Sequence, residues 1–373
     1  MHRPAMVRTS AWLSAIAILV VGATSMVANA ASAMATPPKT WSVSAQYPSG
    51  GNPTSLTSVS CASARDCVAV GRYGSQLGVA IYTTDGGATW TISKSGVLTS
   101  QQSYANGFFG VSCVPYKTSA WCDAVASVGT MAYVVYSSDA GMDWNEGSLL
   151  DASALVSISC VPQDSSAPWC VVVGYGAYYS HDGGKTWTLS PSVSTSGTPA
   201  LSSVSCANNK DCVAVGTSSY YTVNGGSTWT EINPNPVLAP VGYVSCAQAH
   251  HRSQCTAVFD NTSCHSNDGG PSWTCESGFD LGPSGRFDPL SCVTGSTCTA
   301  GGETSGGAEV LDTTDGGSDW AISAAGAAVF SKASSLGGDR VSSDPVSCVA
   351  ELCSAVGKGS DGNPLIFIGP RPL

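Results

Sequence analysis

Charged side chains are scarce in this chain, and basic ones are the scarcest. Only 11% of its 373 residues are charged, with 15 Lys and Arg against 25 Asp and Glu, which gives a net charge of −10. Loss of Arg3 and Arg8 with a cleaved leader changes that charge by two, to −12. A chain with so few cations has little to neutralise phosphates, so nucleic acid and anionic membrane surfaces are disfavoured as partners.

The motifs of several enzyme classes are also missing. No segment has the 3.6-residue periodicity of an amphipathic helix. The sequence contains no phosphate-binding loop, no Gly-x-Ser-x-Gly elbow, no HExxH pair and no dinucleotide fingerprint. Gly, Ser and Thr abound instead, as is typical of a turn-rich extracellular β protein. We therefore expect no cofactor and no metal.

The N-terminus has the organisation of a secretory signal peptide. A basic start precedes an apolar run over 11–27, and small residues allow cleavage near Ala30 or Ala33. The run is short for a membrane span, so an uncleaved anchor is the less favoured alternative. We predict a signal peptide over 1–33, a mature domain over 36–373 and a secreted protein without a membrane span after cleavage.

Sixteen cysteines in an exported chain predict disulfides. They form eight close couples: Cys61 with Cys67, Cys113 with Cys122, Cys160 with Cys170, Cys206 with Cys212, Cys246 with Cys255, Cys264 with Cys275, Cys292 with Cys298, and Cys348 with Cys353. Seven of the couples recur once per repeat, so pairing within each couple is the simplest solution. A row of zinc sites is the alternative, but each metal needs four converging ligands and the couples lack CxxC spacing.

An eight-residue motif, called the box below, recurs every 42 to 54 residues, and its first copy over 83–90 reads TTDGGATW. A period in this range is typical of propellers and solenoids. The six copies carry these residues: Asp85 and Trp90, Asp139 and Trp144, Asp182 and Trp187, Asn224 and Trp229, Asp268 and Trp273, Asp315 and Trp320. The acidic side chain can accept hydrogen bonds from nearby backbone, glycine tolerates positive φ, and tryptophan packs between strands. Asn224 keeps the acceptor without the charge, which favours a structural turn over a catalytic carboxylate.

Each repeat contains four short β-branched or alternating runs separated by Gly, Ser and Asp. In the first repeat these runs cover 56–61, 67–71, 79–83 and 90–93, so the two cysteines stand at the ends of the first hairpin. Seven such units in series predict an all-β, seven-bladed β-propeller of four-stranded antiparallel blades.

The seventh unit stops after its third run, and the mature N-terminus contains what it lacks. The segment 39–44 reads KTWSVS and closely matches KTWTLS over 185–190, which ends the third box. We therefore predict that residues 41–45 form the fourth strand of the seventh blade. The first and last segments then share one sheet, so the ring closes and no blade is left with an exposed edge.

The pattern S-x-D-x-G-x-T-W resembles the Asp box, or BNR repeat, of the sialidase superfamily, and it covers essentially the whole mature chain. Similar boxes occur in photosystem II assembly factors, sortilin-type receptors and some endoglucanases, so the resemblance implies a fold and not one activity. A sialidase resembling this chain needs three arginines around the substrate carboxylate and an Arg-Ile-Pro motif. No Arg-Ile-Pro occurs, and at most three of the six mature arginines can reach one face, which disfavours a sialidase.

The topology of a meander assigns the loops to two faces. The cysteine loops and the boxes share one face, and the variable loops lie on the other, where binding and catalytic residues concentrate. A glycosidase needs two carboxylates roughly 5 to 10 Å apart. Glu303 and Asp361, in adjacent blades six and seven, are the candidate catalytic pair. The candidate ligand-binding residues on that face are Arg72, Glu276, Arg286 and Arg340.

These observations favour a non-catalytic function. We expect a secreted, monomeric binding or scaffolding propeller whose ligand is a glycan or an extracellular protein. One alternative is a glycoside hydrolase that uses loop carboxylates on the face opposite the boxes. A second alternative is an extracytoplasmic assembly factor.

Overall fold

The computed structural model of the protein describes residues 39–44, 53–74, 77–94, 105–128, 131–152, 154–164, 166–193, 201–233, 242–249, 251–279, 281, 286–304, 307–323, 333–336, 345–359 and 361–371. All of them belong to the compact unit Thr36–Leu373. The predicted signal peptide lies outside the described residues. Within them the regular structure is all β, and no helix is long and apolar enough to cross a bilayer.

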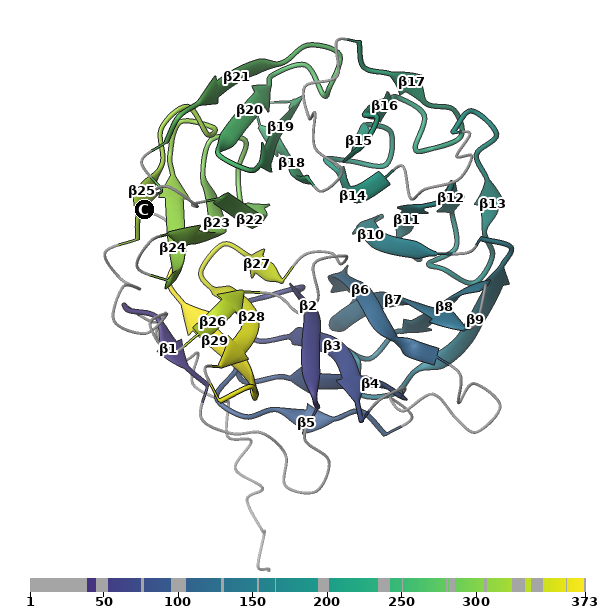
Figure 1. The fold of residues 1–373 in the computed structure, drawn as a ribbon. Helices are drawn as coiled ribbons and strands as arrows, with labels where there is room; N and C mark the ends of the chain where they lie inside the picture. Colours follow the sequence, from purple (N-terminus) through teal and green to yellow (C-terminus); the bar gives the residue numbers. More distant parts are fainter. Residues whose placement is uncertain are drawn as a thin grey trace, which may run out of the picture. The chain divides into compact units, whose positions relative to one another are not determined.

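The strands form seven antiparallel sheets arranged as the blades of a propeller around a central axis (Figure 1). Blade 1 contains β2 (Ser55–Cys61), β3 (Cys67–Tyr73), β4 (Leu77–Thr83) and β5 (Thr91–Ile92). Blade 2 contains β6 (Ala105–Tyr116), β7 (Ser119–Val128), β8 (Met131–Ser137) and β9 (Asn145–Leu150). Blade 3 contains β10 (Leu155–Val161), β11 (Trp169–Gly174), β12 (Ala177–Ser180) and β13 (Thr188–Leu189).

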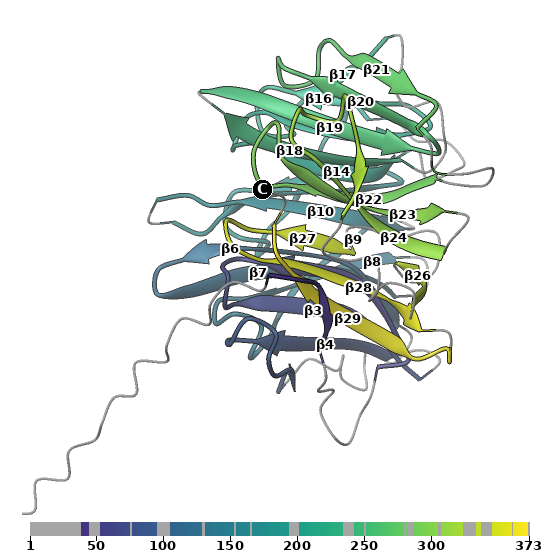
Figure 2. The same ribbon diagram turned by 90° about the vertical axis from the view of Figure 1, so that its left-hand side faces the viewer.

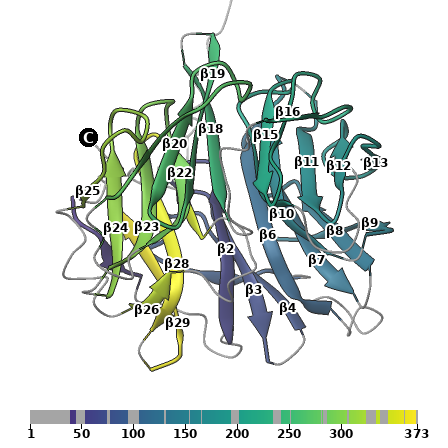
Figure 3. The same ribbon diagram turned by 45° about the horizontal axis from the view of Figure 1, so that its top comes forward.

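The next three blades repeat this order. Blade 4 contains β14 (Leu201–Cys206), β15 (Cys212–Gly216), β16 (Tyr220–Thr222) and β17 (Thr230–Glu231). Blade 5 contains β18 (Tyr243–Ala249), β19 (Arg252–Phe259), β20 (Thr262–Ser266) and β21 (Thr274–Ser277). Blade 6 contains β22 (Arg286–Cys292), β23 (Cys298–Thr304), β24 (Gly307–Thr313) and β25 (Ala321–Ile322). The innermost strands, among them β2, β6, β10, β18 and β22, surround the axis (Figure 3).

Blade 7 is built from both ends of the described chain. It contains β26 (Ala333–Leu336), β27 (Val346–Cys348), β28 (Cys353–Gly359), β29 (Pro364–Gly369) and the N-terminal β1 (Ser42–Val43). Strand β1 pairs with β29, with Ser42 opposite Ile368 and Val43 opposite Phe367, as the tryptophan segment predicts. Figure 2 shows the first blade's β3 and β4 beside β28 and β29 of the last. The ring therefore closes through the sheet of blade 7, in which β29 and β1 come from opposite ends of the described chain.

The hydrophobic core lies in the seams between blades. Seven clusters of buried side chains are present, and each joins two neighbouring blades. In the seam between blades 6 and 7, Trp41 is only 2% exposed and packs with Val310 and Phe367. A Cβ at Gly369 would lie 2.1 Å from the Trp41 indole, so that close approach requires a glycine. Stability of each blade consequently depends on its neighbours.

Strands occupy part of what the sequence suggests are variable loops. In blade 6, β23 and β24 continue until Thr304 pairs with Gly307, so Glu303 belongs to a hairpin strand and not to a loop. In blade 7, β26 precedes β27 and pairs with the same strand, β28, as β27 does. Gly, Ala and Glu are frequent in β23 and β24, and Ala and Ser make up most of β26. These residues give little β-propensity, so the pairing comes from the tertiary context.

The hairpin of blade 5 also continues past its cysteines. From the first repeat one expects the second strand to begin at the second cysteine, as β3 does at Cys67. Strand β19 instead begins at Arg252, three positions before Cys255, and the ladder with β18 extends to the pair Ala249–Arg252. The cysteines of this blade therefore lie within their strands, and the segment between them is largely paired backbone rather than a loop.

Candidate functional site

All eight cysteine couples are disulfides in the structure, and none of the described cysteines is free. Seven of them join the first and second strands of a blade at directly paired positions, as Cys160 and Cys170 do in blade 3. The eighth, Cys264–Cys275, joins β20 to β21 and brackets the box of blade 5. Disulfides in such number indicate an oxidising compartment.

Blade 5 is consequently the blade with two disulfides. Cys246 on β18 and Cys255 on β19 face each other in the ladder, with their Cα atoms 4.0 Å apart. Cys264 and Cys275 repeat this arrangement between the third and fourth strands, again with a Cα separation of 4.0 Å. Covalent links thus join both the inner and the outer strand pairs of this sheet, and Cys255 pairs within its own couple as predicted.

The boxes and the disulfide hairpins lie on one face, as the meander topology predicts. In blade 1 the N–H of Gly86 in the box donates to the carbonyl of Arg65 in the hairpin, at 3.0 Å. The same bond forms from Gly183 to Pro168 in blade 3 and from Gly316 to Ser296 in blade 6. Each of these boxes is thus hydrogen-bonded to the hairpin of its own blade.

The carboxylates of the boxes accept hydrogen bonds from residues of the same box. Asp85 Oδ1 accepts the Thr89 N–H at 2.9 Å and the Thr83 hydroxyl at 2.7 Å, and Oδ2 accepts the Thr89 hydroxyl at 2.6 Å. Burial acts to raise the pKa of Asp85, but these hydrogen bonds outweigh it and lower the pKa. The box aspartates of blades 3, 5 and 6 show the same direction. Such groups stay ionised and engaged, which suits a turn and not an acid catalyst.

Asn224 shows that the box works without a charge. Its Oδ1 accepts the Thr228 N–H at 2.9 Å and the Thr222 hydroxyl at 2.9 Å, as the aspartates do. Its Nδ2 donates to the Thr228 hydroxyl at 2.8 Å, in place of the bond that a carboxylate accepts. The turn therefore requires an oxygen acceptor at this position and does not require a carboxylate.

A ring of seven serines surrounds the propeller axis. Each serine precedes the first cysteine of its blade and accepts the backbone N–H of the first cysteine in the next blade, over 2.8 to 3.0 Å. The serines are Ser60, Ser112, Ser159, Ser205, Ser245, Ser291 and Ser347. The last bond, from Cys61 to Ser347, joins blade 1 to blade 7 and completes the circle. The sequence signal for this ring is the Ser-Cys pair that opens every repeat.

The serine ring lines a cavity of about 110 Å³ on the axis, together with the aliphatic residue before each serine. That second ring consists of Val59, Val111, Ile158, Val204, Val244, Leu290 and Val346. Each hydroxyl accepts one N–H and keeps its own proton to donate. None of these fourteen lining residues is titratable, so they supply neither a general acid nor a general base.

The structure places the predicted binding residues in different blades. Arg72 lies near the end of β3 in blade 1, and its stem packs on Gly107 of blade 2, where a Cβ would lie 2.2 Å from Arg72 Cγ. Glu276 is exposed on β21 in blade 5. Arg286 begins β22 in blade 6, opposite Glu303 in the backbone register. Arg340 lies outside the described residues.

The candidate catalytic pair stays a prediction. Asp361 is exposed in the turn between β28 and β29, and the backbone N–H and side-chain amide of Asn363 lower its pKa. A general acid needs the opposite shift. The side chain of Glu303 is not among the described ones. Glu309, on the neighbouring strand β24, has a pKa raised by burial, and burial also raises the pKa of Asp312 three positions further along that strand.

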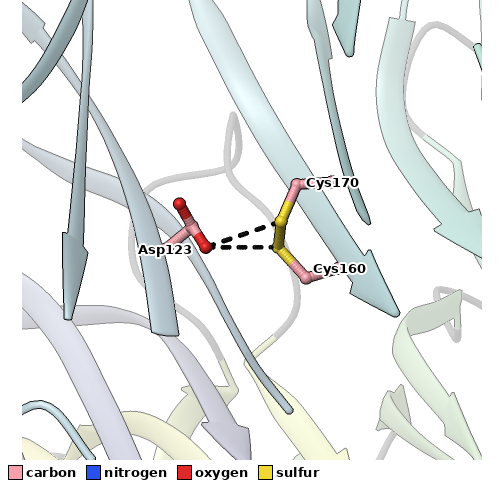
Figure 4. Close-up of side chains that lie close together, drawn as sticks. All are labelled: Asp123, Cys160 and Cys170. Atoms are coloured by element: carbon pink, nitrogen blue, oxygen red, sulfur yellow. Dashed lines mark hydrogen bonds between the residues drawn. A yellow bond between two sulfur atoms is a disulfide. The ribbon is translucent and has the colours of Figure 1, made fainter. Parts of the chain in front are cut away.

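A more strongly perturbed carboxyl lies where no candidate was expected. Asp123 in β7 is completely buried in the seam between blades 2 and 3, and its Oδ2 lies 3.5 Å from both sulfurs of Cys160–Cys170 (Figure 4). Desolvation, the largest cause, holds its pKa well above the ordinary value, and the negative charge of Asp182 adds to that rise. The Trp121 indole acts in the other direction. Its Nε1 does not reach hydrogen-bonding geometry with Asp123 Oδ1, however, and neither atom has a partner among the described residues.

Comparison with known proteins gives similarity in structure alone. No family model matches the sequence, and no curated protein matches it. The structure is similar to that of YCF48 bound to a D1 peptide, with a TM-score of 0.57, 16% identity, and coverage of 90% of this chain and 100% of that one. It is also similar to YCF48 from Cyanidioschyzon merolae, with a TM-score of 0.54, 12% identity, and coverage of 88% and 98%.

An enzyme has a comparable fold. The GH74 xyloglucanase from Xanthomonas campestris gives a TM-score of 0.54 at 13% identity, over 76% of this chain and 47% of that one. At such identities the likeness concerns the fold and not the activity. The chain is an all-β, seven-bladed propeller, and it shares the propeller fold with a protein solved in complex with a peptide and with a glycoside hydrolase.

Proposed function

We propose that this protein is a non-catalytic binding propeller that acts outside the cell and holds a peptide segment or a glycan. The observation that carries the proposal is the axial cavity, whose fourteen lining residues are seven serines and seven aliphatic side chains. Ligand sites are commonly concave, with polar groups that fix the orientation of the ligand, and hydrolysis requires a positioned acid and base as well. A hydroxyl-lined axis supports binding and offers no group for proton transfer.

The secreted location is part of the same proposal. The eight disulfides support an oxidising environment. The leader predicted over 1–33 would deliver the chain there. We also infer that the boxes are Asp boxes of the BNR type, supported by the acceptor role of Asp85 and Asn224 and by the indole N–H of Trp187, which donates to the Gly184 carbonyl at 2.9 Å.

A peptide is the first ligand class to test. The likeness to a propeller solved with a bound peptide, over 90% of this chain, supports it. An extracytoplasmic assembly factor is one form of such a binder. The glycosidase alternative keeps one supporting observation, the likeness to a xyloglucanase.

One experiment separates these functions. The secreted protein is applied to peptide and polysaccharide arrays, and each captured ligand is then incubated with protein and analysed for cleavage. Binding without product supports the proposal, and no binding to either array contradicts it. Product formation that Glu303→Gln or Asp361→Asn abolishes would instead establish the hydrolase.

A further inference from the structure

One position in each blade lies at the seam with the next blade. It is the residue after the second cysteine of the hairpin, and in five seams a Cβ on the second glycine of the next box would meet its side chain. In six blades this residue is small and uncharged: Val68, Val171, Val213, Thr256, Thr299 and Ser354. In blade 2 it is Asp123. Blade 3 accommodates it through Gly184, whose added Cβ would lie 1.8 Å from Asp123 Oδ1.

The contact between Asp123 and the disulfide has only one possible direction for a hydrogen bond. A disulfide sulfur carries no hydrogen, so the proton in the 3.5 Å contacts with Cys160 and Cys170 must come from the carboxyl (Figure 4). Complete burial keeps the neutral acid favoured. A neutral carboxyl at this position directs its proton to both sulfurs of one disulfide.

The other polar and charged groups around the carboxyl come from three elements. Ser112 on β6 and Tyr136 on β8 lie opposite Asp123 in the two strand registers. Asp182 approaches from the box of blade 3 and opposes ionisation. Lys185, from the same box, lies over the Trp121 and Tyr136 rings, 5.4 and 5.8 Å from their centroids.

We propose that Cys160–Cys170 is a redox-active disulfide that dithiols reduce, with Asp123 positioned to protonate the departing sulfur. A thiolate of the dithiol attacks one Sγ and forms a mixed disulfide. The electron pair of the broken S–S bond goes to the other Sγ, which takes the proton of Asp123. The second thiol of the reductant, deprotonated by water, then attacks its own sulfur in the mixed disulfide. This step releases the remaining cysteine, which takes a proton from water, and the reductant leaves as a cyclic disulfide. Solvent reprotonates Asp123, so two electrons and two protons have moved from dithiol to cystine.

Access does not distinguish this disulfide from its neighbours. The first cysteines Cys113, Cys160 and Cys206 are each 7% exposed, and their partners are fully buried. The couples Cys113–Cys122 and Cys206–Cys212 pack with Val68 and Val171 and are therefore internal controls. Exposure is therefore no source of selective reactivity, and the buried carboxyl of Asp123 is a group that both control couples lack.

The test measures reduction of all eight disulfides in the intact chain. Protein is treated with a small dithiol at about pH 6 and about pH 8, alkylated at intervals and mapped by mass spectrometry; we expect Cys160–Cys170 to open about ten-fold faster than both control couples at the lower pH. The advantage should shrink where rising pH removes the proton of the carboxyl. Asp123→Asn, which keeps the shape, and Asp123→Val, which copies the other blades, should both remove it.

Thr256→Val is the matched control, because Thr256 Oγ1 lies 3.7 Å from Cys298 Sγ without an acidic proton. In this variant Cys292–Cys298 should open at the same rate as in the unaltered chain. Equal reduction of Cys160–Cys170 and the two control couples in the unaltered chain would overturn the proposal. So would an Asp123 variant that slows Cys113–Cys122 by the same factor, because the effect would then be general stability.

Discussion

The backbone N–H of Cys61 donates to the Oγ of Ser347 at 3.0 Å, across 286 positions of sequence. It is one of seven equivalent bonds around the axis, and it joins the first blade to the last. A polar contact at this point therefore acts as the closing link of the ring, in addition to the β1–β29 pairing at the outer edge.

Replacement of Ser347 by Ala should destabilise the closed ring. The Cys61 N–H loses its partner inside the seam, and we expect the free energy of unfolding to fall by about 1–2 kcal/mol. Denaturant titration measures this change. Ser166→Ala, at an exposed serine that donates to Gln163, should stay within about 0.5 kcal/mol of the unaltered protein. Equal effects of the two variants would contradict the role of the serine ring.

Trp41→Ala should open the seam between blades 6 and 7. Trp41 is 2% exposed and packs with Val310 and Phe367, so its truncation should cost about 3–5 kcal/mol. Chemical denaturation measures the loss in the free energy of unfolding. Limited proteolysis of blade 7, whose strand β29 loses its outer neighbour, should accelerate. Thr40→Ala, at the exposed neighbouring residue, is the control and should leave both measurements unchanged. A mild effect of Trp41→Ala would mean that the N-terminal strand contributes little to closure.

Asp123→Val should stabilise the protein at neutral pH by about 1–3 kcal/mol, because it removes a buried polar group. The pKa of Asp123 is raised in the folded state, so the unfolded chain releases this proton first as pH rises. The stability of the unaltered protein therefore falls as pH rises from the ordinary aspartate pKa through the folded-state pKa. Below both pKa values this penalty is absent. The free energy of unfolding of Asp123→Val, measured across that pH range, should exceed that of the unaltered protein by an amount that grows with pH. Thr256→Val should retain the pH slope of the unaltered protein, and an Asp123→Val gain independent of pH would contradict the assignment.

Asp182→Asn should be tolerated far better than Asp182→Ala. Asp182 Oδ1 accepts bonds from Thr186 and Ser180, and the amide oxygen of Asn224 accepts the equivalent two bonds, whereas alanine should cost about 1–2 kcal/mol. The pKa of Asp182 is lowered, so its stabilisation is complete above the ordinary aspartate value and is lost as pH falls through the folded one. Thermal unfolding at neutral and acidic pH tests both points. Equal losses in the two variants would show that the charge, and not the acceptor, holds the turn.

The repeat made most of the fold predictable. A cysteine couple in each unit and the tryptophan segment over 39–44 predict seven blades and their closure, because each is a local pattern repeated at blade spacing. The pairing of Trp41's strand with β29 follows from the seventh unit's missing fourth run. Strand lengths were less predictable, since β23 and β24 are rich in Gly, Ala, Thr and Glu, whose pairing depends on the neighbouring blades. The early start of β19, before Cys255, is a second such case.

The environment of single side chains was the least predictable part. Asp123 follows Cys122 in sequence, and nothing local places it against Cys160 and Cys170 of the next blade. Only the alignment of blades shows that its position otherwise carries Val, Thr or Ser. The serine ring was within reach of the sequence, because a Ser-Cys pair opens all seven units, but its bonds run between units and not within them.

The spacing of the covalent links implies an order of assembly. Every disulfide spans between 5 and 11 positions, so each hairpin can be oxidised as soon as it emerges, without waiting for its neighbours. Ser42, in contrast, meets Ile368 only after 326 further positions have been made. A nascent chain would therefore accumulate cross-linked but unclosed blades, with its first strand waiting for its last.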